Sequence, residues 1–171
     1  CLDCLEGKGR RKGHDAVRSE KFDTPTPMLL FATDFFGKVK PTSCRNSKGV
    51  RLFACYKCGY AMAQPLRQKA EAPDVLEKFV HTIREKCGVK YGETRNSNNQ
   101  LIFAGIRSDN EPVLRSQQWK EVCAKLNLTE THSVPYEPEM NGKVERLVQT
   151  IKQALRTTCQ HVDARVWDYA L

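Results

Sequence analysis

The sequence predicts an α/β domain whose central β-sheet is mixed, has about five strands, and carries helices on both faces. Three observations support this fold class. Three strand-like apolar segments follow one another in the first half of the chain, which is typical of antiparallel hairpins. Later strand-like segments alternate with helical patterns, which favours parallel pairing. The 171 residues suffice for one such domain and a short tail.

The first half of the chain supplies the antiparallel part of this sheet. An apolar run at 28–36 predicts a buried strand. Segments 50–57 and 60–66 predict two further strands, and the Cys-Gly pair at 58–59 between them predicts a tight turn. Strands joined by such short connections pair in antiparallel fashion.

The middle of the chain predicts a helix and then a strand. Residues 72–87 have Pro73 in the first turn and Gly88 after the last, which are common start and stop residues of a helix. The apolar residues of this segment share one helix face and lie at positions 75, 76, 79, 80, 83 and 87. After an asparagine-rich loop at 92–100, the apolar run at 101–110 predicts one continuous strand.

The last third predicts two helices around a short strand. Ser116 can cap a helix over residues 117–126. A short strand at 128–133 leads into a segment rich in proline and glycine, which predicts a loop. From Lys143 the sequence has no Pro or Gly for at least 14 residues and its apolar residues return at helical spacing, so a long helix is expected.

The chain carries a net charge of +8, and the excess is concentrated in one stretch. The residues from 38 to 69 include no acid and eight cations, which are Lys38, Lys40, Arg45, Lys48, Arg51, Lys57, Arg67 and Lys69. This basic block predicts a polyanionic partner, nucleic acid first, although a solvated basic face would give the same pattern. No apolar run approaches the ~20 residues that span a bilayer, so no membrane partner is expected.

Three carboxylates have unusual positions. Asp34 lies inside an apolar strand, where an acid is costly. Asp109 lies at the carboxyl end of a strand, where α/β sheets gather ligand sites. Glu145 lies in the first turn of the last long helix, and 35 residues separate it from Asp109. Singly, each is explained as a turn, cap or helix-dipole residue. Together they suit metal-assisted phosphoryl transfer, because Mg²⁺ takes oxygen ligands and can activate an attacking oxygen and stabilise a leaving one.

Three motifs around these acids resemble the catalytic core of retroelement integrases, most closely the copia-type retrotransposon integrases. Asp34 lies in "ATDFFGKV", which is similar to the first-strand motif of that family. Asp109 lies in "RSDN", which is similar to the second-acid motif. Glu145 lies near the end of the segment "YEPEMNGKVER", whose Pro, Asn-Gly and Glu-Arg match the family's loop and helix start. The similarity covers about residues 28–171.

The resemblance implies a ribonuclease H-like fold and a polynucleotidyl transferase with endonuclease activity. Such an enzyme uses Mg²⁺ or Mn²⁺, trims the ends of element DNA and joins the freed 3′-hydroxyls to target DNA. Its metal ligands would be Asp34, Asp109 and Glu145. Its partners would be element and target DNA and further copies of the chain. Its place of work would be the nucleus, after a cytoplasmic particle stage.

The last long helix carries a candidate DNA contact surface. Glu145, Gln149, Lys152 and Arg156 recur on one helix face and form a polar stripe beside the apolar one. A carboxylate followed by an amide and two cations suits a metal site that continues into a phosphate track. A solvated helix face is the alternative. The family carries a DNA-contacting lysine at the position of Lys152, and the candidate contacts in the preceding segment are Asn141, Gly142 and Lys143.

The sequence departs from the family pattern in two places. Glu111 and Pro112 stand where the family has Gly and then an acid-aromatic pair, so Glu111 could compete for metal. Lys57 and Cys58 stand where copia-type members often carry an acid-rich strand end. The first departure concerns the loop that follows Asp109, whereas Asp109, the expected metal ligand, is present.

The N-terminal residues 1–27 are basic and are expected to be a leader joined to the core at 28–171, with the core truncated at its C-terminus. Cys1 and Cys4 resemble the second half of a His-His-Cys-Cys zinc domain, whose histidines would lie upstream. Zinc is therefore expected only in that incomplete domain. A shared four-cysteine site with Cys55 and Cys58 is a further arrangement that the spacing allows.

Other functions remain open from the sequence. A cut-and-paste transposase or a nuclease of the same fold would share the three acids, although the Cys-x-x-Cys leader argues against it. A domesticated, inactive module that only binds nucleic acid is also compatible, although intact acids at intact spacing argue against decay. A zinc-ribbon binding protein is the remaining alternative, and stoichiometric zinc would favour it.

Overall fold

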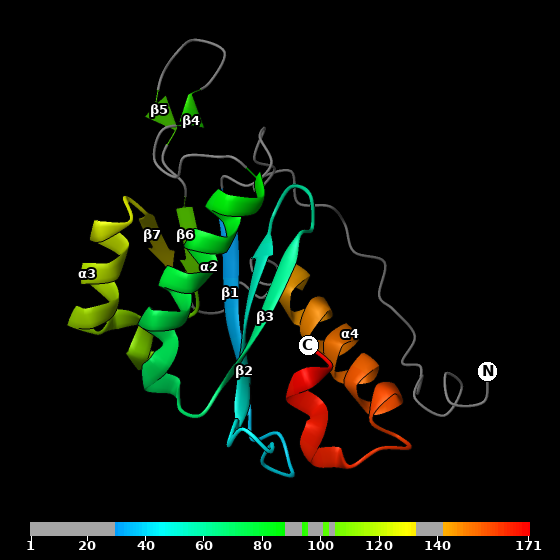
Figure 1. Cartoon of the computed structure of the whole chain (residues 1–171). Coiled ribbons are helices and arrows are strands. Elements are labelled where there is room, and N and C mark those ends of the chain that lie inside the picture. Colours follow the sequence, from blue (N-terminus) through cyan, green and yellow to red (C-terminus); the bar gives the residue numbers. More distant parts are fainter. Residues whose placement is uncertain (1–29, 88–93, 96–100, 103–104, 133–141) are drawn as a thin grey trace.

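A computed structural model of the chain describes residues 30–87, 94–95, 101–102, 105–132 and 142–171. Its centre is a five-stranded sheet with helices on both faces (Figure 1). In chain order the strands of this sheet are β1 (Leu30–Gly37), β2 (Gly49–Cys55), β3 (Ala61–Leu66), β6 (Gly105–Ser108) and β7 (Thr129–His132). The α/β fold class predicted from the sequence is therefore confirmed.

The sheet is mixed, as expected. Its strand order is β3-β2-β1-β6-β7. The two pairs β1–β2 and β2–β3 are antiparallel, whereas β6 lies parallel to both β1 and β7. Gly59 has a φ of 73° in the turn between β2 and β3, which is the tight turn predicted there. One edge of the sheet is β3, in which Pro65 lies opposite Val50.

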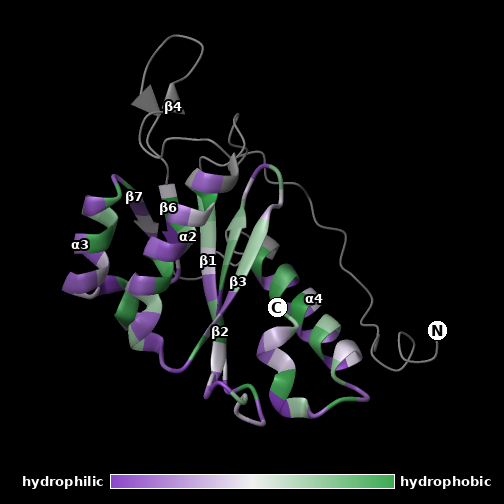
Figure 2. Ribbon diagram, in the orientation of Figure 1, coloured by the Kyte–Doolittle hydropathy of each residue, from purple (hydrophilic) through white to green (hydrophobic). Residues whose placement is uncertain are grey.

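Three long helices cover the sheet, and short 3₁₀ segments connect or extend them. The helices are α2 (Ala72–Cys87), α3 (Gln117–Lys125) and α4 (Gly142–Thr158), and the 3₁₀ segments are η2 (Lys69–Glu71), η3 (Pro112–Arg115) and η5 (Ala164–Tyr169). The Ser116 side chain accepts a hydrogen bond from the backbone N–H of Trp119, which confirms the predicted cap of α3. Hydrophobic and hydrophilic residues alternate along the helices in Figure 2, as expected where one side of each helix covers the sheet.

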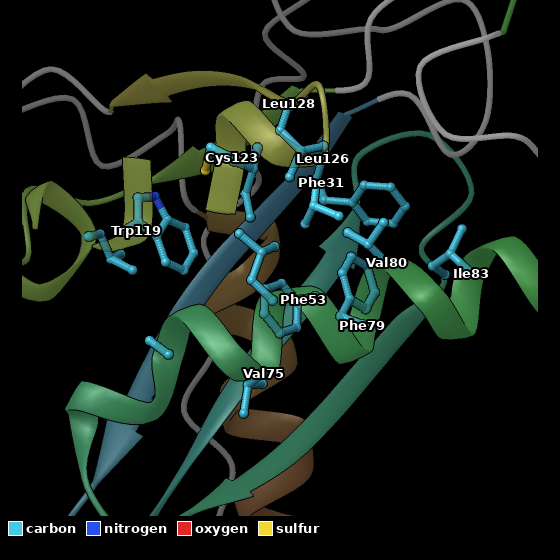
Figure 3. Packing of buried hydrophobic residues seen from close by; sticks show 14 of the residues in the cluster. Phe31, Phe53, Val75, Phe79, Val80, Ile83, Trp119, Cys123, Leu126 and Leu128 are labelled. Atoms are coloured by element: carbon cyan, nitrogen blue, oxygen red, sulfur yellow. The ribbon is translucent and has the colours of Figure 1, made fainter. Parts of the chain in front are cut away.

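The face of the sheet covered by α2 and α3 holds the larger hydrophobic core. Phe79 of α2 stacks on Phe53 of β2 with ring centroids 4.3 Å apart, and it meets Phe31 of β1 edge-on at 5.0 Å (Figure 3). Trp119 and Leu126 extend this core beneath α3. We call this side of the sheet the α2 face.

The opposite side, which we call the α4 face, holds a second core. Ala32 and Phe36 of β1 pack there with Val144, Val148 and other residues of α4. Ala32 and Phe36 alternate along β1 with Phe31 and Phe35, which lie on the α2 face. The two cores therefore fix which side chains of each strand point to which face.

The C-terminal segment is attached to the connection between β1 and β2. Asp168 is buried and accepts hydrogen bonds from Ser43 Oγ at 2.7 Å and Ser47 Oγ at 3.2 Å. The indole N–H of Trp167 donates to the carbonyl oxygen of Pro41 at 2.9 Å. η5, which was not predicted, therefore closes the lower end of the α4 face (Figure 1).

The expectation of one strand over 101–110 is wrong. The residues form two separate strands, because β5 (Leu101–Ile102) pairs with β4 (Thr94–Arg95) in a small sheet and β6 begins only at Gly105. β6 joins the central sheet with Gly105 opposite Leu30, the first residue of β1. Among the described residues, none of the helices combines the length and apolar character needed to cross a bilayer.

Candidate active site

Asp34 points toward the α4 face. It lies on β1 between Ala32 and Phe36, both of which pack in the α4-face core. Because side chains two residues apart in a strand share a face, the Asp34 carboxylate lies on that face as well. Its Oδ1 accepts a hydrogen bond from the backbone N–H of Phe35 at 2.7 Å, which orients the carboxylate.

Asp109 lies near Asp34, directly after the neighbouring strand. β6 runs parallel to β1 with Ala32 opposite Arg107 and ends at Ser108. The charge of Asp34 acts on the Asp109 carboxyl, which is consistent with two carboxyls close together. The Arg107 guanidinium lies 5.7 Å from the ring centroid of Tyr56, a residue of the α4-face core. Asp109 follows Arg107 by two positions and so faces the same side.

The electrostatics of Asp109 are those of a carboxyl beside other carboxyls. Burial raises the pKa of the Asp109 carboxyl, and the negative charges of Glu111 and Asp34 raise it further. A hydrogen bond from the backbone N–H of Glu111, 3.2 Å from Asp109 Oδ1, and the charge of Arg51 act in the opposite direction without cancelling the rise. Asp109 is therefore a partly buried carboxyl that has the charges of Asp34 and Glu111 nearby.

Glu145 lies in the first turn of α4 and is exposed. Its neighbour Val144 and the following Val148 are buried against the sheet, so the start of the helix is packed on the α4 face. Within the residues that the structure describes, no three His, Cys, Asp or Glu side chains gather closely enough to hold a metal ion. The structure thus brings Asp34 and Asp109 together and places Glu145 on the helix that covers them, without closing a three-ligand cluster.

The polar stripe of α4 lies on its exposed side. Gln149, Lys152 and Arg156 are all exposed. Lys152 Nζ lies 5.3 Å from the ring centroid of Phe36, two residues beyond Asp34 on the same strand face. A cation therefore lies near the end of β1 on the side where the two aspartates point.

Some expected site residues fall outside the part of the chain that the structure describes. These are Asn141, the side chain of Lys143, and the Cys1 and Cys4 pair. Gly142 is described and is the first residue of α4. Of the two cysteines that could complete a shared four-cysteine site, Cys55 is buried and Cys58 is exposed.

Glu111 is engaged by cations rather than free for a metal. Arg51 Nη2 lies 2.7 Å from Glu111 Oε2, and Lys69 Nζ contacts Oε1. Burial alone raises the pKa of the Glu111 carboxyl, but the hydrogen bonds from Lys69 and Arg51 outweigh burial and hold it below its ordinary value. Two members of the basic block therefore pair with Glu111. Arg51 is fully buried and so does not form part of an open basic surface, whereas Lys69 is exposed.

Sequence reasoning missed the role of Arg51, and a signal for it exists. Arg51 is one charged residue in the otherwise apolar strand β2, just as Asp34 is the one acid in β1. A lone charge in a buried strand predicts a specific partner, because an unpaired buried charge is costly. The partner Glu111 is 60 residues away, and only the fold identifies it.

The chemistry of these two carboxylates suits a divalent magnesium or manganese ion. Asp34, within β1, and Asp109, directly after β6, offer carboxylate oxygens, which are the hard ligands that Mg²⁺ prefers. Burial is the main cause of the raised pKa of the Asp109 carboxyl, and the charges of Glu111 and Asp34 add to it; a bound divalent cation would act in the opposite direction.

Comparison with known proteins points to retroelements. No protein-family model matches the chain. The Transposon Tf2-3 and Tf2-4 polyproteins of Schizosaccharomyces pombe (strain 972 / ATCC 24843) are 39% identical over 54 residues, which are 32% of this chain. The chain spans only 4% of the length of these polyproteins.

A solved structure shares the fold. A chain of the cryo-EM structure of the simian T-cell lymphotropic virus intasome in complex with PP2A regulatory subunit B56 gamma matches with a TM-score of 0.62 and 19% identity, covering 94% of this chain and 52% of that chain. The mixed five-stranded sheet agrees with the expected ribonuclease H-like architecture. The similarity over 54 residues and the shared fold support the expected resemblance to a retroelement integrase core, and the copia-type subclass stays a prediction.

Proposed function

We propose that the chain is the catalytic core of a retroelement integrase, which processes the ends of element DNA and joins their 3′-hydroxyls to target DNA. The observation that carries this proposal is that the strand of Asp34 pairs with the strand that leads into Asp109, and that the charge of Asp34 acts on the Asp109 carboxyl. Sequence similarity to Tf2 polyproteins and the fold shared with an intasome chain support it. Because the chain spans so little of those polyproteins, the activity of the whole protein belongs to the proposal.

The proposal assigns Asp34, Asp109 and Glu145 as the ligands of Mg²⁺ or Mn²⁺. The bound ion would supply positive charge at the attacking and leaving oxygens of the phosphodiester. Asp34 is pre-oriented by the Phe35 N–H, and Asp109 by the Glu111 N–H. Glu145 would complete the set from the first turn of α4, which packs on the same face of the sheet.

DNA binding is assigned to exposed cations near these acids. Lys152 lies close to Phe36 at the end of β1, and Gln149 and Arg156 lie exposed on the same helix. Such side chains are suited to phosphate contacts, which position DNA without reading its sequence. Element and target DNA, further copies of the chain, and a nuclear place of work are the partners and location that follow from this function.

Replacement of the two aspartates tests the proposal. We expect Asp34→Asn and Asp109→Asn, each in the complete integrase, to lower Mg²⁺-dependent strand transfer by orders of magnitude, because each removes a charged oxygen ligand. Asp163→Asn is the matched control, since Asp163 is exposed on the C-terminal segment and pairs with Arg165. Undiminished strand transfer by the folded Asp109 variant would contradict the proposal.

DNA binding without catalysis is the second candidate function. It is favoured by the finding that no three-ligand cluster is closed within the described residues. It predicts that the wild-type protein binds DNA with a strong salt dependence but shows no strand transfer with either Mg²⁺ or Mn²⁺. Metal-dependent strand transfer by the wild type would exclude it.

A further inference from the structure

We propose that Glu111 is a positioning residue for the pair Asp34–Asp109, held in place by Arg51 and Lys69 from the opposite face of the sheet. This inference rests on the proposed function, because it concerns how the two presumed ligands are kept together. It assigns a role to an ion-pair cluster that neither DNA contact nor metal ligation accounts for.

The cluster is built on the ring of Phe35, the residue directly after Asp34. A Cβ atom on Gly37 would lie 2.5 Å from Phe35 Cε1, and one on Gly49 would lie 2.5 Å from Phe35 Cζ. Gly37 and Gly49 are cross-strand partners, so the ring lies flat over a pair of positions that have no side chains. The ring thus occupies one defined place on the α2 face.

Two cations lie over this ring. The Arg51 guanidinium carbon is 5.3 Å from the ring centroid, and Lys69 Nζ is 4.8 Å from it. Arg51 is the cross-strand partner of Phe35, whereas Lys69 belongs to η2, beyond β3. Both distances are within the range of a cation–π contact. The ring therefore brings together cations from two separate elements.

Both cations bind one carboxylate, and that carboxylate belongs to the turn after Asp109. Arg51 and Lys69 contact different oxygens of Glu111. The Glu111 backbone N–H in turn donates to Asp109 Oδ1, as the Phe35 N–H donates to Asp34 Oδ1. Each aspartate is thus hydrogen-bonded by the backbone of a residue whose side chain belongs to the cluster on the other face.

The cost of this arrangement argues for a function beyond stability. Arg51 is fully buried, and its Nε and Nη1 atoms have no hydrogen-bond partner among the described residues. A buried ion pair with unsatisfied donors contributes little net stability compared with apolar side chains of similar size. What the cluster does achieve is to fix the backbone on both sides of the aspartate pair.

The test measures Mn²⁺ binding to this chain by the loss of the free-ion signal in electron paramagnetic resonance. The key variant is Arg51→Met/Glu111→Met, which replaces both buried charges with apolar side chains and is expected to remain folded. We expect its dissociation constant for Mn²⁺ to rise by about 10–100-fold, the usual consequence of losing a group that orients a metal ligand. Lys125→Met/Glu77→Met removes an ion pair between α2 and α3 in the same way and should leave the constant unchanged.

Single variants distinguish a positioning role of Glu111 from direct metal ligation. They also test the inference if the double variant does not fold. Arg51→Met frees one oxygen of Glu111, so a direct metal ligand would then bind Mn²⁺ more tightly, whereas a positioning residue predicts weaker binding. Glu111→Gln keeps the size of the side chain and should weaken binding, and Arg51→Lys should restore part of it relative to Arg51→Met. Wild-type affinity in the folded double variant or in Glu111→Gln would overturn the inference.

Failure of the proposed function has a different signature. Asp34→Asn and Asp109→Asn should each abolish Mn²⁺ binding if these residues are ligands. Wild-type binding that survives both substitutions would overturn the proposed function and this inference with it. Binding that depends on both aspartates but not on Arg51 or Glu111 would overturn the inference alone.

Discussion

At the level of Asp34, the two faces of the sheet hold opposite charge. The α2 face carries Arg51 and Lys69 bound to the single carboxylate of Glu111, whereas the α4 face carries Asp34 and Asp109 side by side. On the first face two cations share one carboxylate. On the second face two carboxylates lie near each other, and the pKa of the Asp109 carboxyl is raised, first by burial and then by the charges of Glu111 and Asp34. Under the proposed function, the first face would support the site and the second would receive a cation.

The largest expected effect is the loss of strand transfer when a proposed metal ligand on the α4 face is replaced. Glu145→Gln keeps the size and helix propensity of the side chain but removes the charge that a divalent ion requires. Strand transfer by the complete integrase should fall by orders of magnitude, while the thermal unfolding midpoint should change little because Glu145 is exposed. If Glu145 served only the helix dipole, activity would persist and stability would fall by a few tenths to about 1 kcal/mol.

The next effect tests the α2 face as a packed support. Phe79→Ala removes a ring that stacks on Phe53 and meets Phe31, so it should lower the free energy of unfolding by about 3–5 kcal/mol. Urea unfolding followed by circular dichroism measures this loss. Val162→Ala, at an exposed position, should stay within about 0.5 kcal/mol of wild type. Equal losses in the two variants would contradict the assignment of the core.

A smaller effect concerns the place of the Phe35 ring. Gly49→Ala puts a methyl group where the ring and the Gly37 backbone already lie, so overpacking should cost about 1–3 kcal/mol in chemical denaturation. Gly142→Ala is the comparison, because a Cβ there meets no atom within 4 Å among the described residues. A Gly49 variant as stable as wild type would mean that the ring can move away without loss.

The smallest effect is the opposite pKa shift of two carboxyls, Asp109 and Glu111, that are two residues apart. The pKa of Asp109 is raised, so its contribution to stability is complete below its unfolded pKa and is lost as pH rises through the folded one. The pKa of Glu111 is lowered, so its contribution is present above its unfolded pKa and is lost as pH falls through the folded one. Carboxyl ¹³C titration without metal should give Asp109 above and Glu111 below their ordinary values. The reverse order would contradict the charge arrangement.

The sequence predicted those parts of the molecule that local patterns determine. Alternation and apolar runs located β1 and the helices, and the lone acid in β1 pointed to Asp34. Contacts between residues far apart along the chain could not be predicted from the sequence. The pairing of Arg51 with Glu111 and the attachment of Asp168 to Ser43 join residues 60 and 125 positions apart. Leu101–Ile102 and Gly105–Ser108 belong to different sheets because they have different pairing partners, which the apolar pattern of the segment itself does not contain.

Pro65 has a consequence for how copies of the chain can associate. It lies in β3, an edge strand, where an exposed row of backbone groups could recruit a strand from another molecule. Proline has no N–H to donate, so it interrupts that row near the end of the strand. Continuous sheet formation across β3 between two molecules is therefore disfavoured, which guards against strand-mediated aggregation. Functional assembly of several copies would use side-chain surfaces instead of a shared sheet through this edge.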